Sequence, residues 1–275
     1  MTLGERPVTP PIVLTFAASD PTGGAGVQAD ILTIAALGAH PLSVLTGVTV
    51  QDTRGIEGTQ AVDDDWLVDQ ARVLLEDISV QAFKIGVLCS VENVAAVAEV
   101  LADYPDIPVV FDPVIASGRG DPLADEEMLI AMSELLLPLT TVLTPNSIEA
   151  RRLTQEEDDS EDVEDIALAD CANFLIELGA KHVLVTGTHE QAPQVVNTLY
   201  GPSGMLCTDA WERLPGSFHG SGCTLASAIA VMLARGMDVR EAVQAAQRYT
   251  WNTLAHAINP GMGQAIPNRF YAHRF

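Results

Sequence analysis

The chain has 275 residues and a formal net charge of −23. This charge disfavours nucleic acids and anionic membranes as partners, because phosphate polyanions would be repelled. No apolar run reaches the ~18 residues that cross a bilayer, and the first residues lack the order of a signal peptide, so we expect a cytoplasmic protein.

Charged and sulfur-containing residues are unevenly used. Only Lys84 and Lys181 are lysines, and eight of the ten residues from Glu156 to Asp165 are acidic. We interpret that run as a solvated loop and helix entry, with metal binding a distant second. Acidic, lysine-poor composition also suits a salt-rich cytoplasm. The four cysteines show no C-x-x-C spacing, so the sequence indicates neither a zinc site nor a disulfide framework.

Apolar runs alternate between strand and helix spacing along the whole chain, and no Pro-, Gly- and Ser-rich stretch divides it, so we expect one domain over 1–275. The alternation predicts a mostly parallel sheet with helices on both faces. The segment 42–50 is expected to be buried on both faces, and 195–208 to form an antiparallel hairpin. Strands are expected at 12–17, 42–50, 82–88, 108–111, 141–143, 182–186, 195–199 and 205–208, and helices at 27–37, 66–78, 91–103, 126–137, 166–178, 224–235 and 239–258.

Polar residues follow most of the expected parallel strands. Ligands of such sheets bind beyond the carboxyl ends of the strands, where these residues would meet. They are Ser19-Asp20 with the glycine loop 23–26, Gln51-Asp52, Asp112, Asn146 to Glu149, and Thr186-Gly187.

The stretch from His219 to Gly236 begins with a Gly-Ser-Gly-Cys sequence and continues as an apolar helix. The backbone N–H groups of Ser221, Gly222 and Cys223 would be unpaired donors of its first turn, which favours an anion site. The alternative is a tight turn that leads into a core helix, because short glycine motifs often occur without a ligand.

Phosphoryl transfer needs phosphate donors and a metal site. Asp112 and the Asn146-x-x-Glu149 pair could supply the metal side, although Asn146 and Glu149 alone could be a helix capping box. Both functions are compatible. The chain has no G-x-x-x-x-G-K-[ST] motif, and its first glycine loop does not match G-x-G-x-x-G, so a P-loop enzyme and a dinucleotide fold are disfavoured.

Seven segments together resemble, in order, the signatures of hydroxymethylpyrimidine/phosphomethylpyrimidine kinases of the ribokinase-like superfamily. The resemblance runs from about residue 12 to 271 and includes the tail from Gly261 to Tyr271. It implies a three-layer α/β/α ribokinase-like fold with a small antiparallel addition, and a homodimer. The segments are 18–30, 50–55, 84–86, 112–114, 120–123, 144–149 and 219–224.

The resemblance implies ATP- and Mg²⁺-dependent phosphorylation of 4-amino-5-hydroxymethyl-2-methylpyrimidine, of its monophosphate, or of both, in thiamine biosynthesis. It implies substrate contacts from Ala18, Asp30, Gln51, Val87 and Val114. It further implies that Asp112 and Glu149 organise the metal, that Asn146, Glu149, Thr186 and Gly187 bind ATP, and that Gly220, Ser221, Gly222 and Cys223 form the catalytic anion hole.

Cys223 stands where most sugar kinases of that superfamily have an aspartate base. A thiol at a helix N-terminus can have a lowered pKa, so we expect Cys223 to act as a base toward the alcohol. A phosphate acceptor is already anionic and needs no strong base.

Two departures from the family pattern leave alternatives open. Ala18 is commonly glycine, and Thr186 replaces a lysine expected at the ATP phosphates, for which Arg119 or a monovalent cation could compensate. The alternatives are pyridoxal kinase activity on the same scaffold and a catalytically weak pyrimidine-binding regulatory protein.

Overall fold

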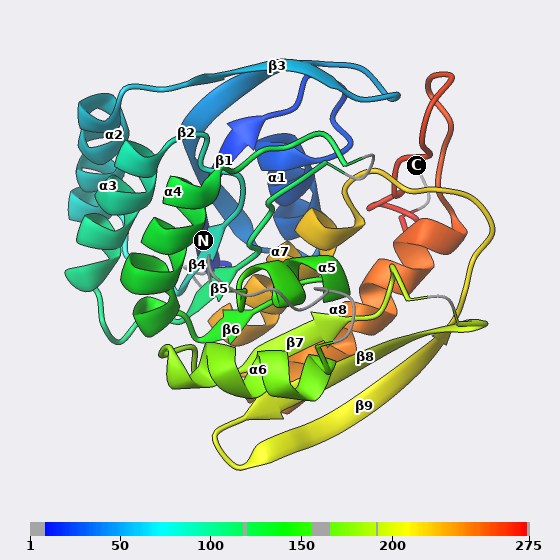
Figure 1. Cartoon of the computed structure of the whole chain (residues 1–275). Coiled ribbons are helices and arrows are strands. Elements are labelled where there is room, and N and C mark those ends of the chain that lie inside the picture. The colour runs from blue at the N-terminus through cyan, green and yellow to red at the C-terminus, as the bar shows by residue number, and fades with distance from the viewer. Residues whose placement is uncertain (1–8, 118–119, 156–165, 191, 274–275) are drawn as a thin grey trace, which may run out of the picture.

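The computed structural model describes residues 9–117, 120–155, 166–190 and 192–273. Within these residues the strands form one nine-stranded sheet in the order β3-β2-β1-β4-β5-β6-β7-β8-β9 (Figure 1). The strands are β1 Ile12–Ser19, β2 His40–Gln51, β3 Ile56–Ala61, β4 Ala82–Ile85, β5 Val109–Phe111, β6 Val142–Leu143, β7 Val183–Thr186, β8 Gln194–Gly201 and β9 Gly204–Glu212.

The strands from β2 to β7 are parallel, whereas β3, β8 and β9 pair antiparallel at the two ends of the sheet. The central strands are short runs of apolar residues, and Leu14, Phe16 and Phe83 are fully buried. Such runs suit a sheet that helices cover on both faces. The expected mostly parallel sheet and the hairpin near 195–208 are confirmed.

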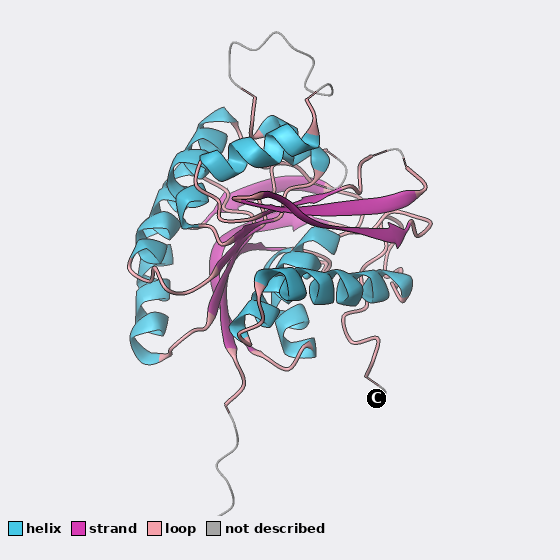
Figure 2. Cartoon of the chain, turned by 90° about the horizontal axis from the view of Figure 1, so that it is seen from below, coloured by secondary structure: helices cyan, strands magenta, loops and turns pink. Residues whose placement is uncertain are grey.

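Helices cover both faces of this sheet (Figure 2). One core contains residues of α2, α3, α4, α5 and α6, and the other contains residues of α1, α7 and α8. The three-layer α/β/α expectation is therefore confirmed. No helix of the described ranges is long and apolar enough to cross a membrane. The helices are α1 Gly26–Ala36, α2 Asp64–Asp77, α3 Val91–Ala102, α4 Glu126–Ala131, α5 Ser147–Arg152, α6 Leu168–Glu177, α7 Ser221–Ala234 and α8 Val239–Ala255.

Three details differ from the sequence expectations. The end of β2 is not buried on both faces, because Val48 and Val50 are 47% and 64% exposed beside the edge strand β3. β3 itself was not predicted. The helix expected at 126–137 keeps α-geometry only to Ala131 and continues as a π-turn, Met132–Leu136, and a 3-10 turn that contains Pro138.

Because β1, β2, β5, β6 and β7 are parallel, their carboxyl ends meet at one edge of the sheet. The segment beyond β6 also touches the end of β7, through a bridge between Asn146 and Thr186. The helix α7 begins at the same edge, since Gly222 lies against Asp112 beyond β5. The topology thus gathers the polar residues that the sequence singled out.

Candidate active site

A cavity of about 530 Å³ lies at this edge of the sheet. Most of the residues expected at the site line it, and two, Asp30 and Gly187, do not. The expected residues that line it are Ala18, Gln51, Val87, Asp112, Val114, Asn146, Glu149, Thr186, Gly220, Ser221, Gly222 and Cys223.

The amino end of α7 opens into the cavity. No side chain caps the helix at Gly220, so the N–H groups of its first turn have no intrahelical partner. Gly220 has a φ of +84°, and a Cβ there would overlap the carbonyl oxygen of Gly24. The turn therefore requires glycine, and it presents backbone donors at the positive end of the helix dipole to an anion.

A buried carboxylate, Asp112, faces this helix end, and a second one, Glu149, lies near Asp112. Asp112 is 4% exposed, and its Oδ2 has no hydrogen-bond partner within the described part of the chain. Burial raises the pKa of Asp112 despite the attraction of Lys84, and burial together with the Asp112 charge raises the pKa of Glu149. The negative charges of both carboxylates are thus poorly neutralised by the protein alone.

A divalent cation fits this pair of carboxylates. Within the described residues no cluster of three or more His, Cys, Asp or Glu side chains could hold a metal. Mg²⁺ commonly takes only one or two protein carboxylates and completes its shell with water and substrate phosphates. The unpartnered Oδ2 of Asp112 and the nearby Glu149 match that donor set.

Asn146 and Glu149 form a capping box at the start of α5. The Asn146 side chain accepts from the N–H groups of Ile148 and Glu149 at 2.9 Å, and Glu149 Oε2 accepts from Asn146 N at 2.8 Å. The structural interpretation of this pair is therefore confirmed. It coexists with a place on the cavity wall, because the box holds Glu149 next to Asp112.

Asp112→Asn is expected to reduce phosphoryl transfer roughly a hundredfold or more, since the amide is a poor ligand for a divalent cation. The unligated variant should be at least as stable as wild type at pH 8. The pKa of Asp112 is higher in the folded than in the unfolded chain, so wild type loses stability as the pH rises from the unfolded to the folded pKa and the buried carboxyl ionises. The neutral amide of asparagine avoids this loss. Turnover and thermal unfolding at pH 5 and 8 test both parts. Asp106→Asn, at an exposed carboxylate, is the control, and a less stable but active Asp112→Asn would contradict the assignment.

Cys223 lies in the first turn of α7 and is buried. Burial raises the pKa of its thiol to about 12, although Lys84 opposes this, and Asp112 and Asp30 raise it further. The expectation of a pKa lowered by the helix end is therefore wrong for the unligated protein. The thiol is protonated there and lies close enough to Asp112 for the two groups to influence each other's pKa.

Asp30 does not reach the cavity, contrary to the expectation that it contacts the substrate. Its side chain is fully buried and forms an ion pair of 2.9 Å with Lys84 Nζ. It also accepts hydrogen bonds from the hydroxyls of Thr15 and Ser227 at 2.6 and 2.7 Å. The Asp30 carboxylate is therefore bonded to Lys84, Thr15 and Ser227 and does not line the cavity.

Gly187 also lies off the cavity, and its proximity to β8 explains why. Its N–H donates to Asn197 Oδ1 at 3.1 Å, and a Cβ would overlap the carbonyl oxygen of Val196. Gly187 therefore lets the loop after β7 pass close to β8. Thr186 itself remains on the cavity wall.

The cationic residue on the cavity wall is one that the sequence did not single out. Arg213 is the one Arg or Lys among the described residues that line the cavity. It donates to the carbonyl oxygens of Thr188, Glu190 and Ala192 at 2.8 to 2.9 Å. It lies beside the loop where a lysine was expected, whereas Arg119 lies outside the described residues.

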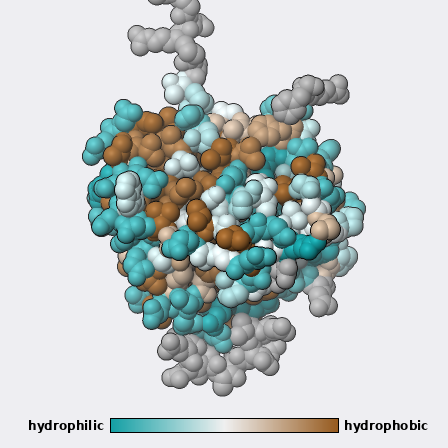
Figure 3. Space-filling model, turned by 90° about the horizontal axis from the view of Figure 1, so that it is seen from above, coloured by the Kyte–Doolittle hydropathy of each residue, from teal (hydrophilic) through white to brown (hydrophobic). Residues whose placement is uncertain are grey.

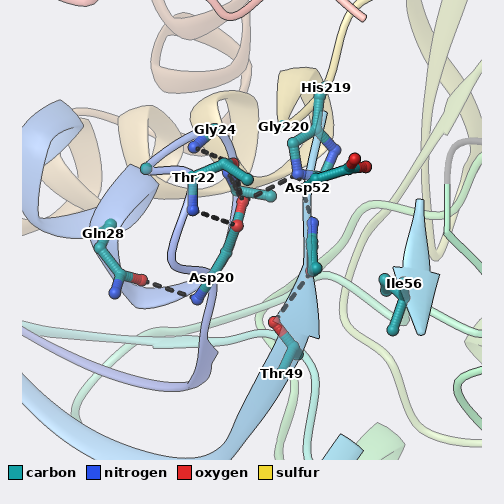
Figure 4. Close-up of polar contacts among 12 residues, drawn as sticks. Asp20, Thr22, Gly24, Gln28, Thr49, Asp52, Ile56, His219 and Gly220 are labelled. Atoms are coloured by element: carbon teal, nitrogen blue, oxygen red, sulfur yellow. Dashed lines mark hydrogen bonds and ion pairs between the residues drawn. The ribbon is translucent and has the colours of Figure 1, made fainter. Parts of the chain in front are cut away.

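A second unexpected group joins two loops of the cavity. His219 Nε2 lies 2.8 Å from Asp20 Oδ2 and 2.7 Å from the amide of Gln51 (Figure 4). Asp20 is 2% exposed, and all three residues line the cavity. The sequence places Asp20 and His219 in separate motifs, 199 residues apart, with no signal that they pair.

A family model described as phosphomethylpyrimidine kinase matches residues 20–268. The chain is 42% identical over 272 residues to a hydroxymethylpyrimidine/phosphomethylpyrimidine kinase of Streptomyces coelicolor, with 96% of each chain covered.

Solved structures agree with the fold. A pyridoxal kinase of Bacillus subtilis in an ADP complex matches with a TM-score of 0.84 and 28% identity, over 96% of this chain and 99% of that one. A phosphomethylpyrimidine kinase of Clostridium difficile matches with a TM-score of 0.73 and 32% identity, over 87% and 97%. The matched family model spans most of the cavity-lining residues and every strand of the sheet except β1. The chain therefore belongs to the phosphomethylpyrimidine kinase family, with a ribokinase-like fold.

Proposed function

We propose that this protein transfers the γ-phosphoryl group of MgATP to 4-amino-5-hydroxymethyl-2-methylpyrimidine and to its monophosphate, as a cytoplasmic enzyme of thiamine biosynthesis. One observation carries the proposal: the unpartnered Oδ2 of Asp112 faces the uncapped amino end of α7 inside one cavity. Cation and anion sites side by side are what a transferring phosphoryl group requires.

The residues of the chain would divide the work as follows. The N–H groups of Ser221, Gly222 and Cys223 bind the transferring phosphoryl group, and Asp112 with Glu149 holds the cation. Bound Mg²⁺ would neutralise charge on the phosphates. Asp112, and Cys223 once its thiol is ionised in the ligated site, would lie where a proton from the acceptor alcohol can be received.

The ring would lie between Gln51 and the small apolar side chains of Ala18, Val87 and Val114, all on the cavity wall. The Gln51 amide offers a polar donor and a polar acceptor among apolar side chains. Such a site selects its ligand strongly, because a ring with the wrong groups leaves the buried amide unpaired. Thr186, Asn146 and Arg213 lie on the same wall, where they would contact ATP.

Two alternatives remain as candidates. Pyridoxal kinase activity is favoured by the similarity to solved pyridoxal kinases. A weakly catalytic binding protein is favoured by Arg213, whose N–H groups already bond to backbone carbonyls.

A turnover panel with MgATP separates these three functions. The substrates are the pyrimidine alcohol, its monophosphate and pyridoxal, and the readout is ADP release. We expect turnover of both pyrimidines at kcat/KM values well above that of pyridoxal. Preference for pyridoxal would support the first alternative, and pyrimidine binding without ADP release would support the second.

We further propose that the protein is a homodimer that uses the β2–β3 end of the sheet. β3 is an edge strand, and Val48 and Val50 expose apolar surface on the neighbouring β2. Figure 3 views the molecule from above Figure 1, where β3 runs, and apolar residues gather on that face. Exposed apolar patches beside an edge strand mark association sites.

Val50→Lys is expected to convert the dimer to a monomer at micromolar concentration, since a charge at a buried contact is costly. The molar mass from light scattering should fall by about half. Val73→Lys on α2, where valine is 68% exposed, is the matched control and should leave the mass unchanged. A monomeric wild type, or an equal effect of both variants, would contradict the proposed surface.

A further inference from the structure

The Asp20 carboxylate is an anchor with many donors. Oδ1 accepts from Thr22 N at 2.8 Å, and Oδ2 accepts from Thr22 Oγ1 at 2.9 Å and from Ala25 N at 2.7 Å. Burial raises the pKa of this carboxyl, but the bonds from His219, Ala25 and Thr22 outweigh burial, and the pKa lies below its ordinary value. The carboxylate of Asp20 is therefore ionised and accepts every hydrogen bond that it forms.

The ionised carboxylate determines where the proton of His219 lies. Its Nε2 is 2.8 Å from Asp20 Oδ2, and two acceptors at that distance would repel each other. Nε2 must therefore carry the hydrogen. The structure has Gln51 Nε2 2.7 Å from the same nitrogen, but two N–H donors at that distance would also repel each other. The hydrogen-bond partners therefore require the amide to be turned, so that its oxygen shares the single Nε2 hydrogen with Asp20 Oδ2.

The other side of Gln51 leads independently to the same orientation. Thr49 Oγ1 lies 3.0 Å from the carbonyl oxygen of Ser19 and 3.0 Å from the atom that the structure has as Gln51 Oε1. A hydroxyl has one hydrogen, and the carbonyl of Ser19 can only accept it. The amide atom facing Thr49 must therefore donate, so it is the nitrogen. Oxygen and nitrogen of an amide have nearly the same shape, and hydrogen-bond partners decide between them.

We propose that His219, held by Asp20, is a positioning residue that together with Thr49 locks the Gln51 amide with its oxygen toward His219 and its nitrogen toward Thr49. Figure 4 shows Asp20, His219 and Thr49 around this network. An amide oxygen accepts two hydrogen bonds and its NH₂ group donates two. One acceptor position and one N–H thus remain for a ligand of the cavity.

In this orientation the Gln51 amide presents an acceptor on its His219 side and a donor on its Thr49 side. A ring with an amino group next to a ring nitrogen matches it, with the amino group on the His219 side and the ring nitrogen on the Thr49 side. The corresponding pyrimidinone, which carries an oxo group and a ring N–H, presents the reverse pattern. Because a locked amide cannot turn, it rejects the pyrimidinone. This selectivity rests on the proposed pyrimidine substrate.

The test compares kcat/KM for the aminopyrimidine alcohol and the matching pyrimidinone alcohol. His219→Phe keeps an aromatic ring packed against Gly24 but removes the N–H, and Thr49→Val removes the hydroxyl without changing shape. Each variant should reduce the amino-to-oxo ratio roughly tenfold or more, mainly through KM, because a free amide can turn to fit either ring.

Thr22→Ala is the matched control, since it also removes one donor from Asp20 Oδ2 but does not contact Gln51. A general loosening of the loop would lower kcat/KM for both rings by the same factor and leave the amino-to-oxo ratio unchanged. An unchanged ratio in Thr49→Val and in folded His219→Phe would overturn the proposal, as would an equal change in Thr22→Ala. If His219→Phe does not fold, Thr49→Val decides.

The outcome is separable from the proposed function. If wild type phosphorylates neither ring, the proposed function fails, and calorimetric dissociation constants of the two rings in the presence of MgADP still give the ratio. Stronger wild-type binding of the pyrimidinone would overturn the amide orientation itself.

Discussion

Replacing Lys84 by methionine is expected to lower the free energy of unfolding by about 3–5 kcal/mol, the usual cost of breaking a buried ion pair from one side. Lys84 and Asp30 are both fully buried, and no water can replace the lost ammonium group. Asp30 keeps its bonds from Thr15 and Ser227, but two hydroxyls do not neutralise a carboxylate. Urea unfolding monitored by circular dichroism at pH 7 measures the loss.

The double variant Lys84→Met with Asp30→Asn tests the cause. Asparagine keeps an oxygen for the two hydroxyls and removes the uncompensated charge, so the double variant should recover at least half of the lost stability. If the double variant is as unstable as Lys84→Met alone, the loss comes from packing around the lysine stem. The close approach of Lys84 Nζ to Gly86, where a Cβ would lie 2.6 Å away, makes that outcome a real competitor.

The sequence predicts β1 and α7 correctly because each is a continuous apolar run. Nearly every residue of these two segments is buried in the core. β3 has the sequence Ile-Glu-Gly-Thr-Gln-Ala and leaves no such pattern. It becomes a strand because β2 extends beyond the sheet core and offers backbone partners, a tertiary cause that a local pattern does not carry.

The sequence predicts which edge of the sheet holds the site, but not where each side chain points. Parallel topology alone places Asp112, Asn146 and Thr186 at one edge, since each lies at or just beyond the end of a parallel strand. The expectation for Asp30 is wrong because the sequence shows only that this residue belongs to α1. Which face of α1 meets Lys84 depends on how the helix packs against β4.

The contact between Asp20 and His219 illustrates a second limit. Each residue belongs to a recognisable motif, but their pairing needs the glycine loop and the start of α7 to lie side by side. The fit is close: a Cβ on Gly24 would overlap His219. Arg269 strengthens this junction, since it donates to the carbonyls of Gly23 and Gly24 and to Thr224 Oγ1.

Lys84, the cation of the buried ion pair, also acts on the two side chains that could receive the proton of the acceptor alcohol, Cys223 and Asp112. Lys84 lowers the pKa of both Cys223 and Asp112, although burial outweighs it in each case. An overall charge of −23 therefore says little about the site, where the nearest full charges are one buried lysine and the carboxylates around it. Which atom receives the proton of an acceptor alcohol depends on this local balance.

Cys223→Ala is expected to lower kcat for the pyrimidine alcohol by roughly 10²–10⁴-fold, the range for loss of a general base, and to affect the monophosphate far less. The alcohol must lose a proton during transfer, whereas the phosphate acceptor is already anionic. Separate kcat and KM values for the two acceptors, with MgATP saturating, measure the difference. Equal losses for both acceptors would mean that Cys223 only shapes the anion hole.

Cys223→Ser then distinguishes two paths for the proton. A hydroxyl is a far weaker acid than a thiol, so if the sulfur itself takes the proton, serine should be nearly as slow as alanine. If the side chain only passes the proton on to Asp112, a serine hydroxyl can pass it on in the same way, and the serine variant should retain most of the alcohol rate. A serine variant as slow as alanine, with the monophosphate rate intact, would identify the sulfur as the base.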